Sequence, residues 1–348
     1  MALHVDRLLA AGILSEGRAS SGGPGRPSSA LALGPAVGVG LGIVFQYASV
    51  SVGVSDGYGA VLVREEAELD PASEPAVALA AAARIAKELL QSRGMSVDAV
   101  KVVVAGMAAP IDVAEGAASY RAIMPQWLHW PLRERLAETF DAVAVVDNDA
   151  NLMAAGAAAS SSASALPLLY LHLSVGVGAG LIGTDGGVYR GADGSAGDIG
   201  HIRLAESSVV RCECGRKGCI GAAVGLEHVL QSAGVLKPGG SVPDAVDRLR
   251  ESEALAAPEA TAALRAAGDD AGILAAALVD AFNPRTVVIG GELVDLSEQV
   301  TAAIRSRVYN EALPVATHRL SILPVESGES LALLGAARAS AEALLHGC

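Results

Sequence analysis

The stretch G-D-I-G-H-I-R-L-A-E-S-S-V-V-R-C-E-C-G-R-K-G-C, residues 197–219, is the most informative part of this sequence. It brings His201 close in sequence to Cys212, Cys214 and Cys219, and these are three of the four cysteines in the chain. One imidazole and three thiolates at this spacing predict a closed, tetrahedral structural Zn²⁺ site. A disulfide is the alternative, but three clustered cysteines leave one unpaired. We recognise no signal-peptide pattern, so we expect a reducing compartment.

The same stretch resembles the ROK proteins (repressors, open reading frames and kinases). Their pattern runs roughly G-E-x-G-H and then C-x-C-G-x-x-G-C-L-E, whereas this chain has G-D-I-G-H and then C-E-C-G-R-K-G-C-I-G. The metal ligands match, but Asp198 and Gly221 each stand where the family has Glu. The resemblance covers residues 36–338. It implies an α/β fold of the two-lobed, actin-like ATPase and sugar-kinase type, preceded by a partial winged helix-turn-helix.

Composition narrows the possible functions. With 348 residues, 51% of them hydrophobic and 18% charged, the chain is long enough for two compact domains. Its apolar runs are too short to cross a bilayer, so we expect a cytoplasmic protein with no membrane partner. The formal net charge of −13 argues against nonspecific nucleic-acid binding by the body of the protein.

The first 35 residues form a separate segment. Residues 4–12 have helical spacing, and residues 13–18 and 29–33 can pair as short strands around a Ser/Gly/Pro loop. A frayed leader with a flexible linker is one interpretation. The segment also resembles the end of the recognition helix plus the wing of ROK repressors, without the two helices that should precede it. We therefore expect a truncated winged-helix remnant in residues 1–35, and DNA binding only by a version extended at the N-terminus.

The rest of the chain alternates between strands and helices. Strands are expected at residues 37–42, 48–54, 59–63, 100–105, 142–146, 168–173, 180–182 and 286–289, and helices at 73–92, 132–140, 225–233, 242–252 and 259–282. Two α/β halves of this kind indicate two lobes with a cleft between them. We assign residues 36–145 to the first lobe and 146–331 to the second. By resemblance, a last helix over residues 332–348 packs back on the first lobe.

The resemblance also locates a nucleotide site, which this sequence retains poorly. The first phosphate hairpin of ROK kinases reads roughly D-x-G-G-T-K, but residues 40–45 here read G-L-G-I-V-F. Gly40 replaces the acid that helps to place Mg²⁺, and apolar side chains replace the hydroxyl and the lysine as far as Phe45. Glycines alone are weak support for phosphate binding and fit tight turns equally well. The nucleotide-side glycines of this degenerate site would be Gly176, Gly178, Gly290 and Gly291.

A polar cluster follows a buried strand in V-V-D-N-D-A-N, residues 145–151. It resembles the N-D-A-N motif of the family. The resemblance assigns Asp149 the general-base position, which is vestigial if no phosphate is transferred, and makes Asn148 a sugar contact. A helix N-cap at Asn148 or Asp149 explains the same residues, and both roles are compatible.

The resemblance gives His201 two roles, as a zinc ligand and as a side chain that faces the sugar. Asp198 retains an acceptor with a shorter reach. Gly221 lacks the second sugar-binding carboxylate, and Ile123 replaces a sugar-contacting Asn. A buried sugar hydroxyl without a partner costs about 1–3 kcal/mol, so ordinary glucose should bind poorly. The expected ligand-binding residues are Asn148, Asp149, Asp198 and His201.

Three functions remain open at this point. The first is a ROK transcriptional regulator that senses a sugar or sugar derivative and forms a homodimer or homotetramer. The second is an ATP-dependent, glucokinase-like sugar kinase. The third is a ligand-free pseudo-kinase scaffold. The degenerate first hairpin and the wing-like N-terminus favour the regulator, with a carbohydrate-like effector and structural Zn²⁺.

Overall fold

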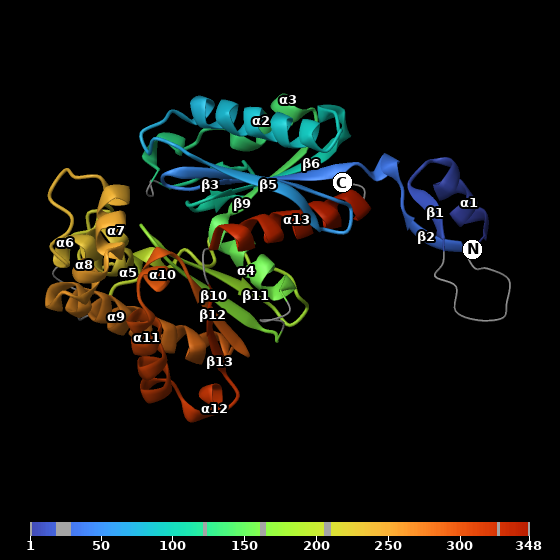
Figure 1. The fold of residues 1–348 in the computed structure, drawn as a ribbon. Coiled ribbons are helices and arrows are strands. Elements are labelled where there is room, and N and C mark those ends of the chain that lie inside the picture. The colour runs from blue at the N-terminus through green and yellow to red at the C-terminus, as the bar shows by residue number, and fades with distance from the viewer. Residues whose placement is uncertain are drawn as a thin grey trace.

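The structure is a computed structural model, and it describes residues 2–18, 29–120, 124–160, 165–204, 210–325 and 328–346. Two main β-sheets with helices packed against them make up the body of the protein (Figure 1). The fold is the α/β architecture that the sequence predicts. None of the described helices combines the length and the hydrophobicity that a membrane span requires.

The first sheet has five strands in the order β5-β4-β3-β6-β9. The strands are β3 (Val39–Phe45), β4 (Ser49–Ser55), β5 (Val61–Glu68), β6 (Val100–Met107) and β9 (Val143–Asn148). Helices α2 (Pro75–Ser92) and α3 (Leu132–Phe140) cover one face, and α13 (Gly328–His346) covers the other (Figure 1). Because both faces are covered, every residue of the central strand β3 is buried.

The second sheet has four strands in the order β11-β10-β12-β13. These are β10 (Leu168–Leu173), β11 (Val177–Ile182), β12 (Thr286–Gly290) and β13 (Ser321–Pro324). Helix α4 (Asp149–Ala159) packs on one face. The main hydrophobic core of this half lies between the other face of this sheet and a layer of helices. The α-helices that follow the β10–β11 hairpin in this half are α5 (Ile220–Val224), α6 (Leu226–Ser232), α7 (Val242–Arg250), α8 (Ser252–Ala256), α9 (Pro258–Phe282), α10 (Glu292–Leu296), α11 (Glu298–Glu311) and α12 (Pro314–Thr317).

Helices α4 and α13 lie against each other and connect the two sheets. Glycine permits this close approach. A Cβ at Gly156 would collide with the carbonyl oxygen of Leu331, and a Cβ at Gly335 would collide with that of Leu152. The abundant small residues of this chain therefore bring the two halves together through backbone-to-backbone packing.

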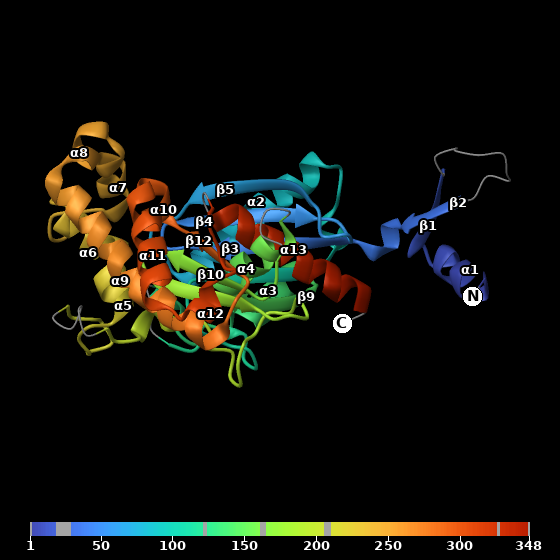
Figure 2. The same cartoon turned by 90° about the horizontal axis from the view of Figure 1, so that it is seen from below.

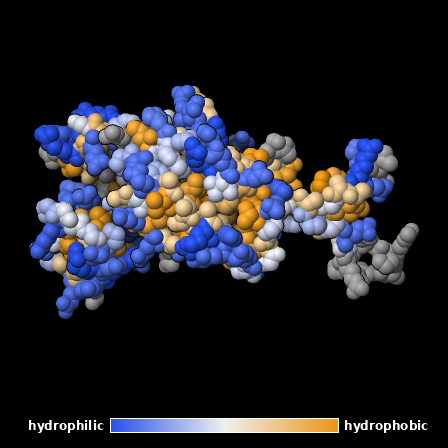
Figure 3. Space-filling model, turned by 90° about the horizontal axis from the view of Figure 1, so that it is seen from above, coloured by the Kyte–Doolittle hydropathy of each residue, from blue (hydrophilic) through white to orange (hydrophobic). Residues whose placement is uncertain are grey.

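The N-terminal residues form a small arm that projects from one end of the body (Figures 1 and 2). It consists of α1 (Ala2–Ala10) and an antiparallel pair, β1 (Leu14–Arg18) and β2 (Ser29–Leu33). The predicted helix and both strands are present, while the loop between the strands lies outside the described residues. The backbone amide of Leu33 donates a 2.7 Å hydrogen bond to the hydroxyl of Tyr58 in the body. Leu8, Ile13 and Leu31 are exposed on this arm. Figure 3 shows hydrophobic residues at the surface of the arm.

Candidate functional site

The carboxyl end of β9 forms a polar corner where α4 begins. Asn148 caps this helix: its Oδ1 accepts a 2.9 Å hydrogen bond from the amide of Ala150. Its Nδ2 donates at 3.0 Å to the carbonyl oxygen of Ala109. The N-cap predicted from the sequence is therefore present. Both ends of the amide are engaged, so Asn148 is held rigidly at the corner.

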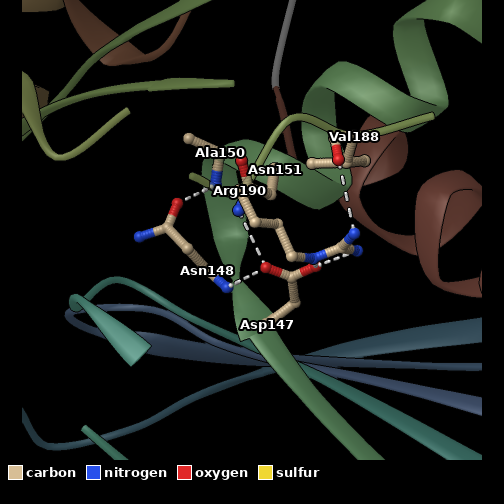
Figure 4. Close-up of polar contacts among 6 residues, drawn as sticks. All are labelled: Asp147, Asn148, Ala150, Asn151, Val188 and Arg190. Atoms are coloured by element: carbon tan, nitrogen blue, oxygen red, sulfur yellow. Dashed lines mark hydrogen bonds and ion pairs between the residues drawn. The ribbon is translucent and has the colours of Figure 1, made fainter. Parts of the chain in front are cut away.

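Asp147 organises this corner through a network that Figure 4 shows. Its Oδ2 accepts from Nη2 and Nε of Arg190 at 2.7 and 3.0 Å. Its Oδ1 accepts from the side-chain amide of Asn151 and the backbone amide of Asn148, both at 2.8 Å. The carboxylate is buried and has four donors, two of them charge-assisted. It thereby ties the first sheet to the segment that follows β11.

Sequence reasoning gave no role to Asp147, Asn151 or Arg190. The first two lie in the quoted segment 145–151, where Asp147 precedes the N-D-A-N motif and Asn151 ends it, and this position was the available signal. Arg190 lies 43 positions from Asp147 and has no motif around it. Only the folded chain brings this pair together.

Asp149 and Asp198 lie close enough for their charges to act on each other. Asp149 is buried at the first position of α4, and burial raises the pKa of its carboxyl, an effect that His172 partly offsets. Burial, followed by the charge of Asp149, raises the pKa of Asp198 to about 7. A carboxyl with a pKa of about 7, as at Asp198, can accept or donate a proton near neutral pH, which suits hydrogen bonding to sugar hydroxyls.

The predicted metal ligands converge. The ligand atoms of His201, Cys212, Cys214 and Cys219 all lie within 4.8 Å of one another. The Sγ of Cys212 is 3.5 Å from Nδ1 of His201, and the Sγ atoms of Cys214 and Cys219 are 3.6 Å apart. Zinc–sulfur bonds of about 2.3 Å in a tetrahedron separate two thiolates by about 3.8 Å. The four side chains therefore fit a metal of this size.

Two further contacts support this cluster. Nε of Arg216 donates to Sγ of Cys214 at 3.5 Å, and this bond lowers the pKa of that thiol to about 6. The ring of Tyr120 meets the ring of His201 edge-on, with centroids 5.4 Å apart. Both contacts favour one placement of the ligating side chains.

Gly221 has a structural explanation. A Cβ at this position would lie 2.9 Å from the carbonyl oxygen of Gly200. The second sugar-binding Glu of the family pattern cannot stand here unless the backbone shifts. Ile123, the other departure noted in the sequence, lies outside the described residues.

The run from Gly40 to Phe45 lies wholly inside β3, and residues 46–48 make the turn into β4. Ile43, Val44 and Phe45 have no exposed surface. A Cβ at Gly40 would collide with Ser340 on α13, so helix packing accounts for the glycine that replaces the acid. This strand presents no bare backbone to cradle a phosphate.

Packing also explains two of the four glycines on the nucleotide side, Gly290 and Gly291. A Cβ at Gly291 would collide with the carbonyl oxygen of Leu173, and one at Gly290 would lie 2.5 Å from the hydroxyl of Tyr170. Gly178 is less constrained, since its Cβ would meet only Ala150 at 3.4 Å. Gly176 ends the β10–β11 turn, where its carbonyl oxygen accepts a hydrogen bond from the amide of Ser174. These glycines are consistent with a close-packed turn region and do not require a nucleotide.

Comparison with known proteins identifies the relationship that this geometry indicates. The sequence profile described as "ROK family" matches residues 41–342. The chain belongs to the ROK family. The prediction of the family and of its sugar-kinase-like fold is thus confirmed.

Curated relatives of this ROK protein include both kinases and repressors. A glucokinase from Halalkalibacterium halodurans is 28% identical over 206 residues, which is 56% of this chain and 62% of the glucokinase. The transcriptional dual regulator NagC of Escherichia coli is 25% identical over 225 residues, covering 63% of this chain and 55% of NagC. Each match spans less than two thirds of the relative's own length.

Solved ROK structures include the same two classes. A ROK family transcriptional regulator, a homologue of the E. coli Mlc protein, has a TM-score of 0.76 at 18% identity and covers 99% of this chain and 89% of its own. A ROK family glucokinase from Streptomyces griseus, solved with glucose and AMPPNP, has a TM-score of 0.71 at 25% identity, over 86% of this chain and 98% of its own. The family supports a sugar-related regulator or kinase.

Proposed function

We propose that this ROK protein is a sugar-sensing transcriptional regulator whose nucleotide site has degenerated. The observation that carries the proposal is β3: Ile43, Val44 and Phe45 are fully buried where a kinase needs a polar phosphate hairpin. Apolar side chains cannot satisfy triphosphate oxygens or place Mg²⁺. Phosphoryl transfer depends on that electrostatic positioning, so its loss abolishes kinase chemistry.

The effector in this proposal is a small carbohydrate-like molecule held by Asn148, Asp149, Asp198 and His201. Asp149 and Asp198 supply acceptors, and the fixed Asn148 corner supplies shape. NagC and the xylose repressor of Bacillus spizizenii are among the curated relatives. A ligand that contacts both the β9 corner and the segment after β11 would favour one arrangement of the two halves, and could thereby signal to the N-terminal arm.

The proposed cofactor is one structural Zn²⁺ bound by His201, Cys212, Cys214 and Cys219. The donor set is that of closed zinc sites, and its short interatomic distances support a single ion. When bound, the metal would cross-link residues 197–219 and orient the His201 ring toward the cleft. Elemental analysis of protein purified without added metal should give close to one zinc per chain; a value near zero with the fold intact would contradict this.

The proposed DNA partner requires an extended N-terminus. The helix and hairpin of residues 1–35 match the order of a recognition helix and wing, but a winged helix needs a partner helix to hold the reader in the major groove. We propose 36–145 and 332–348 as one lobe, 146–331 as the other, and a homodimer or homotetramer formed by the body. Mobility-shift assays on short and extended chains should show specific binding by the extended chain only.

A glucokinase-like sugar kinase is the second candidate. It is favoured by Asp149, which is buried beside Asp198 in the general-base position and has a raised pKa. The glucokinase relatives point the same way. A ligand-free scaffold is the third candidate, supported by the backbone contact that excludes a side chain at Gly221.

One experiment separates the three candidates. Calorimetry with a panel of hexoses and hexosamines should find a binder whose affinity falls at least tenfold in Asp149→Ala and in Asp198→Ala, because each change removes a charge-assisted hydrogen bond. A coupled assay with ATP should show no phosphate transfer above background. Turnover that disappears in Asp149→Asn would establish the kinase instead, and the absence of any binder would favour the scaffold.

A further inference from the structure

A second polar cluster lies at the carboxyl ends of β10 and β12, beside the sugar-facing corner. It consists of Tyr170 and His172 on β10 and Glu292 at the start of α10. His172 pairs in register with Gly290, and the Tyr170 hydroxyl lies close against that glycine. The rings of Tyr170 and His172 are stacked, with centroids 6.3 Å apart. The proposed function uses none of these three side chains.

The polar atoms of this cluster have no hydrogen-bond partners among the described residues. These atoms are Oη of Tyr170, Nδ1 of His172 and Oε2 of Glu292. Tyr170 itself is completely buried. Buried polar groups are almost always paired, because an unpaired group loses its water without compensation. Three such atoms on two elements in contact, β10 and α10, indicate a place where another molecule supplies the missing partners.

The charges around this cluster are mainly negative. Burial, and then the charges of Asp149, Glu292 and Asp295, raise the pKa of Tyr170. The charge of Glu292 also raises the pKa of Asp149, whereas His172 lowers it. Among the described residues, Asp149 and Glu292 take part in none of the ion pairs with Lys or Arg. A cationic group would be attracted here, and a phosphate would be repelled.

We propose that Glu292 and Tyr170, together with Asp149, bind an amino group of the effector, so that the ligand is an amine-bearing sugar. The inference rests on the proposed function, since it extends the proposed sugar site toward the second sheet. An ammonium has three donors, and the cluster offers carboxylate and hydroxyl acceptors from different elements. Glu292 thus determines specificity, by favouring a protonated amine over a neutral or phosphorylated ligand.

A metal ion fits this position less well. In the described part of the chain, the group of three or more His, Cys, Asp and Glu ligand atoms that converges within 4.8 Å is the one at His201. Asp149, His172 and Glu292 do not converge in this way and so do not surround a single ion.

The test is calorimetry at pH 7 with three 2-amino hexoses (glucosamine, galactosamine and mannosamine), their N-acetyl derivatives, the parent hexoses and glucosamine 6-phosphate. The wild-type protein should bind at least one amine about tenfold more tightly than its N-acetyl and parent forms, since it gains charge-assisted hydrogen bonds. Glu292→Gln should reduce this preference to about twofold, and Tyr170→Phe should weaken amine binding more than neutral binding. Glu298→Gln, an exposed change on α11, is the matched control and should leave the preference intact.

Each other outcome has a distinct meaning. If neutral hexoses bind as tightly as amines and depend on Asp149, the amine inference fails while the proposed function stands. If the amine preference persists in both Glu292→Gln and Tyr170→Phe, the amine is recognised elsewhere and the cluster merely holds water, which overturns the inference. If no sugar of any class binds, the proposed effector function fails, and this inference fails with it.

Discussion

The polar corner at Asp147 lies at the end of β9 in the first sheet, and the polar cluster at Tyr170 lies on β10 in the second sheet; the two differ in one respect. The Asp147 carboxylate accepts hydrogen bonds from four donors, all supplied by the chain itself. The hydroxyl of Tyr170 and an oxygen of Glu292 are equally withdrawn from water and have no partner within the part of the chain that the structure describes. A carboxylate with four hydrogen-bond donors from the chain holds its surroundings in place, whereas a buried hydroxyl without a partner is suited to receive a ligand. We therefore expect the Asp147 corner to position the residues around it and the Tyr170 cluster to recognise a ligand.

The largest effect on stability should follow from removing the Asp147 carboxylate, which accepts four hydrogen bonds. Asp147→Ala removes the acceptor of Arg190 and leaves the amides of Asn148 and Asn151 without theirs. We expect the free energy of unfolding to fall by about 2–4 kcal/mol, below the full value for a buried pair because Arg190 is partly exposed and can regain water. Urea unfolding measures this. Arg84→Gln, which breaks an exposed ion pair on α2, should change it by less than about 0.5 kcal/mol. Equal losses of stability in Asp147→Ala and Arg84→Gln would show that the contacts of Asp147 contribute no more than an exposed ion pair.

A pH-dependent effect should appear at Asp198, on which the charge of Asp149 acts. The folded-state pKa of about 7 lies above the ordinary value of 3.8, so the folded protein holds this proton more tightly than the unfolded chain. The contribution of Asp198 to stability is therefore full below about pH 4 and is lost as the pH rises to about 7. Asp198→Asn should gain stability relative to the wild type across that window, by about 1–2 kcal/mol at pH 8. A difference that does not vary between pH 5 and pH 8 would contradict the raised pKa.

A smaller loss is expected from Arg190→Lys. Lysine keeps the charge but replaces two donated hydrogen bonds with a single point contact, so we expect a cost of about 1 kcal/mol. Effector affinity should fall in parallel, because the Asn148–Asp149 corner loses part of its support. Arg190→Gln should be worse than Arg190→Lys in both measurements; the reverse order would mean that charge at this position is unimportant.

The smallest effect on stability is expected in the unsatisfied cluster. Tyr170→Phe removes a hydroxyl that makes no hydrogen bond and retains the ring that fills the core. Replacing an unpaired buried hydroxyl by hydrogen should leave the free energy of unfolding unchanged or raise it by up to about 1 kcal/mol. A loss of more than about 1 kcal/mol in the ligand-free protein would show that the hydroxyl is already satisfied, and the contrast between the two regions would disappear.

Much of this protein could be predicted from local sequence. The set of candidate zinc ligands could be predicted because its four side chains lie within one short segment, so their spacing alone nearly dictates that they meet. The strands β3, β6 and β10 were readable because strands buried on both faces require continuous apolar runs. The N-cap at Asn148 follows from chemistry confined to three residues. Strand limits were less exact, since β11 begins at Val177, before the predicted start at residue 180.

Only the tertiary structure decided which distant residues share an environment. The pairing of Asp147 with Arg190 depends on how the segment after β11 returns to β9, and no local pattern encodes that return. Gly221 looked like a lost sugar contact, yet the Gly200 backbone beside it leaves no room for a side chain. Tyr170 and Glu292 were unremarkable in the sequence, because burial without a partner is a property of the packed chain. Local spacing determines which side chains a short segment presents, whereas long-range packing determines what surrounds them.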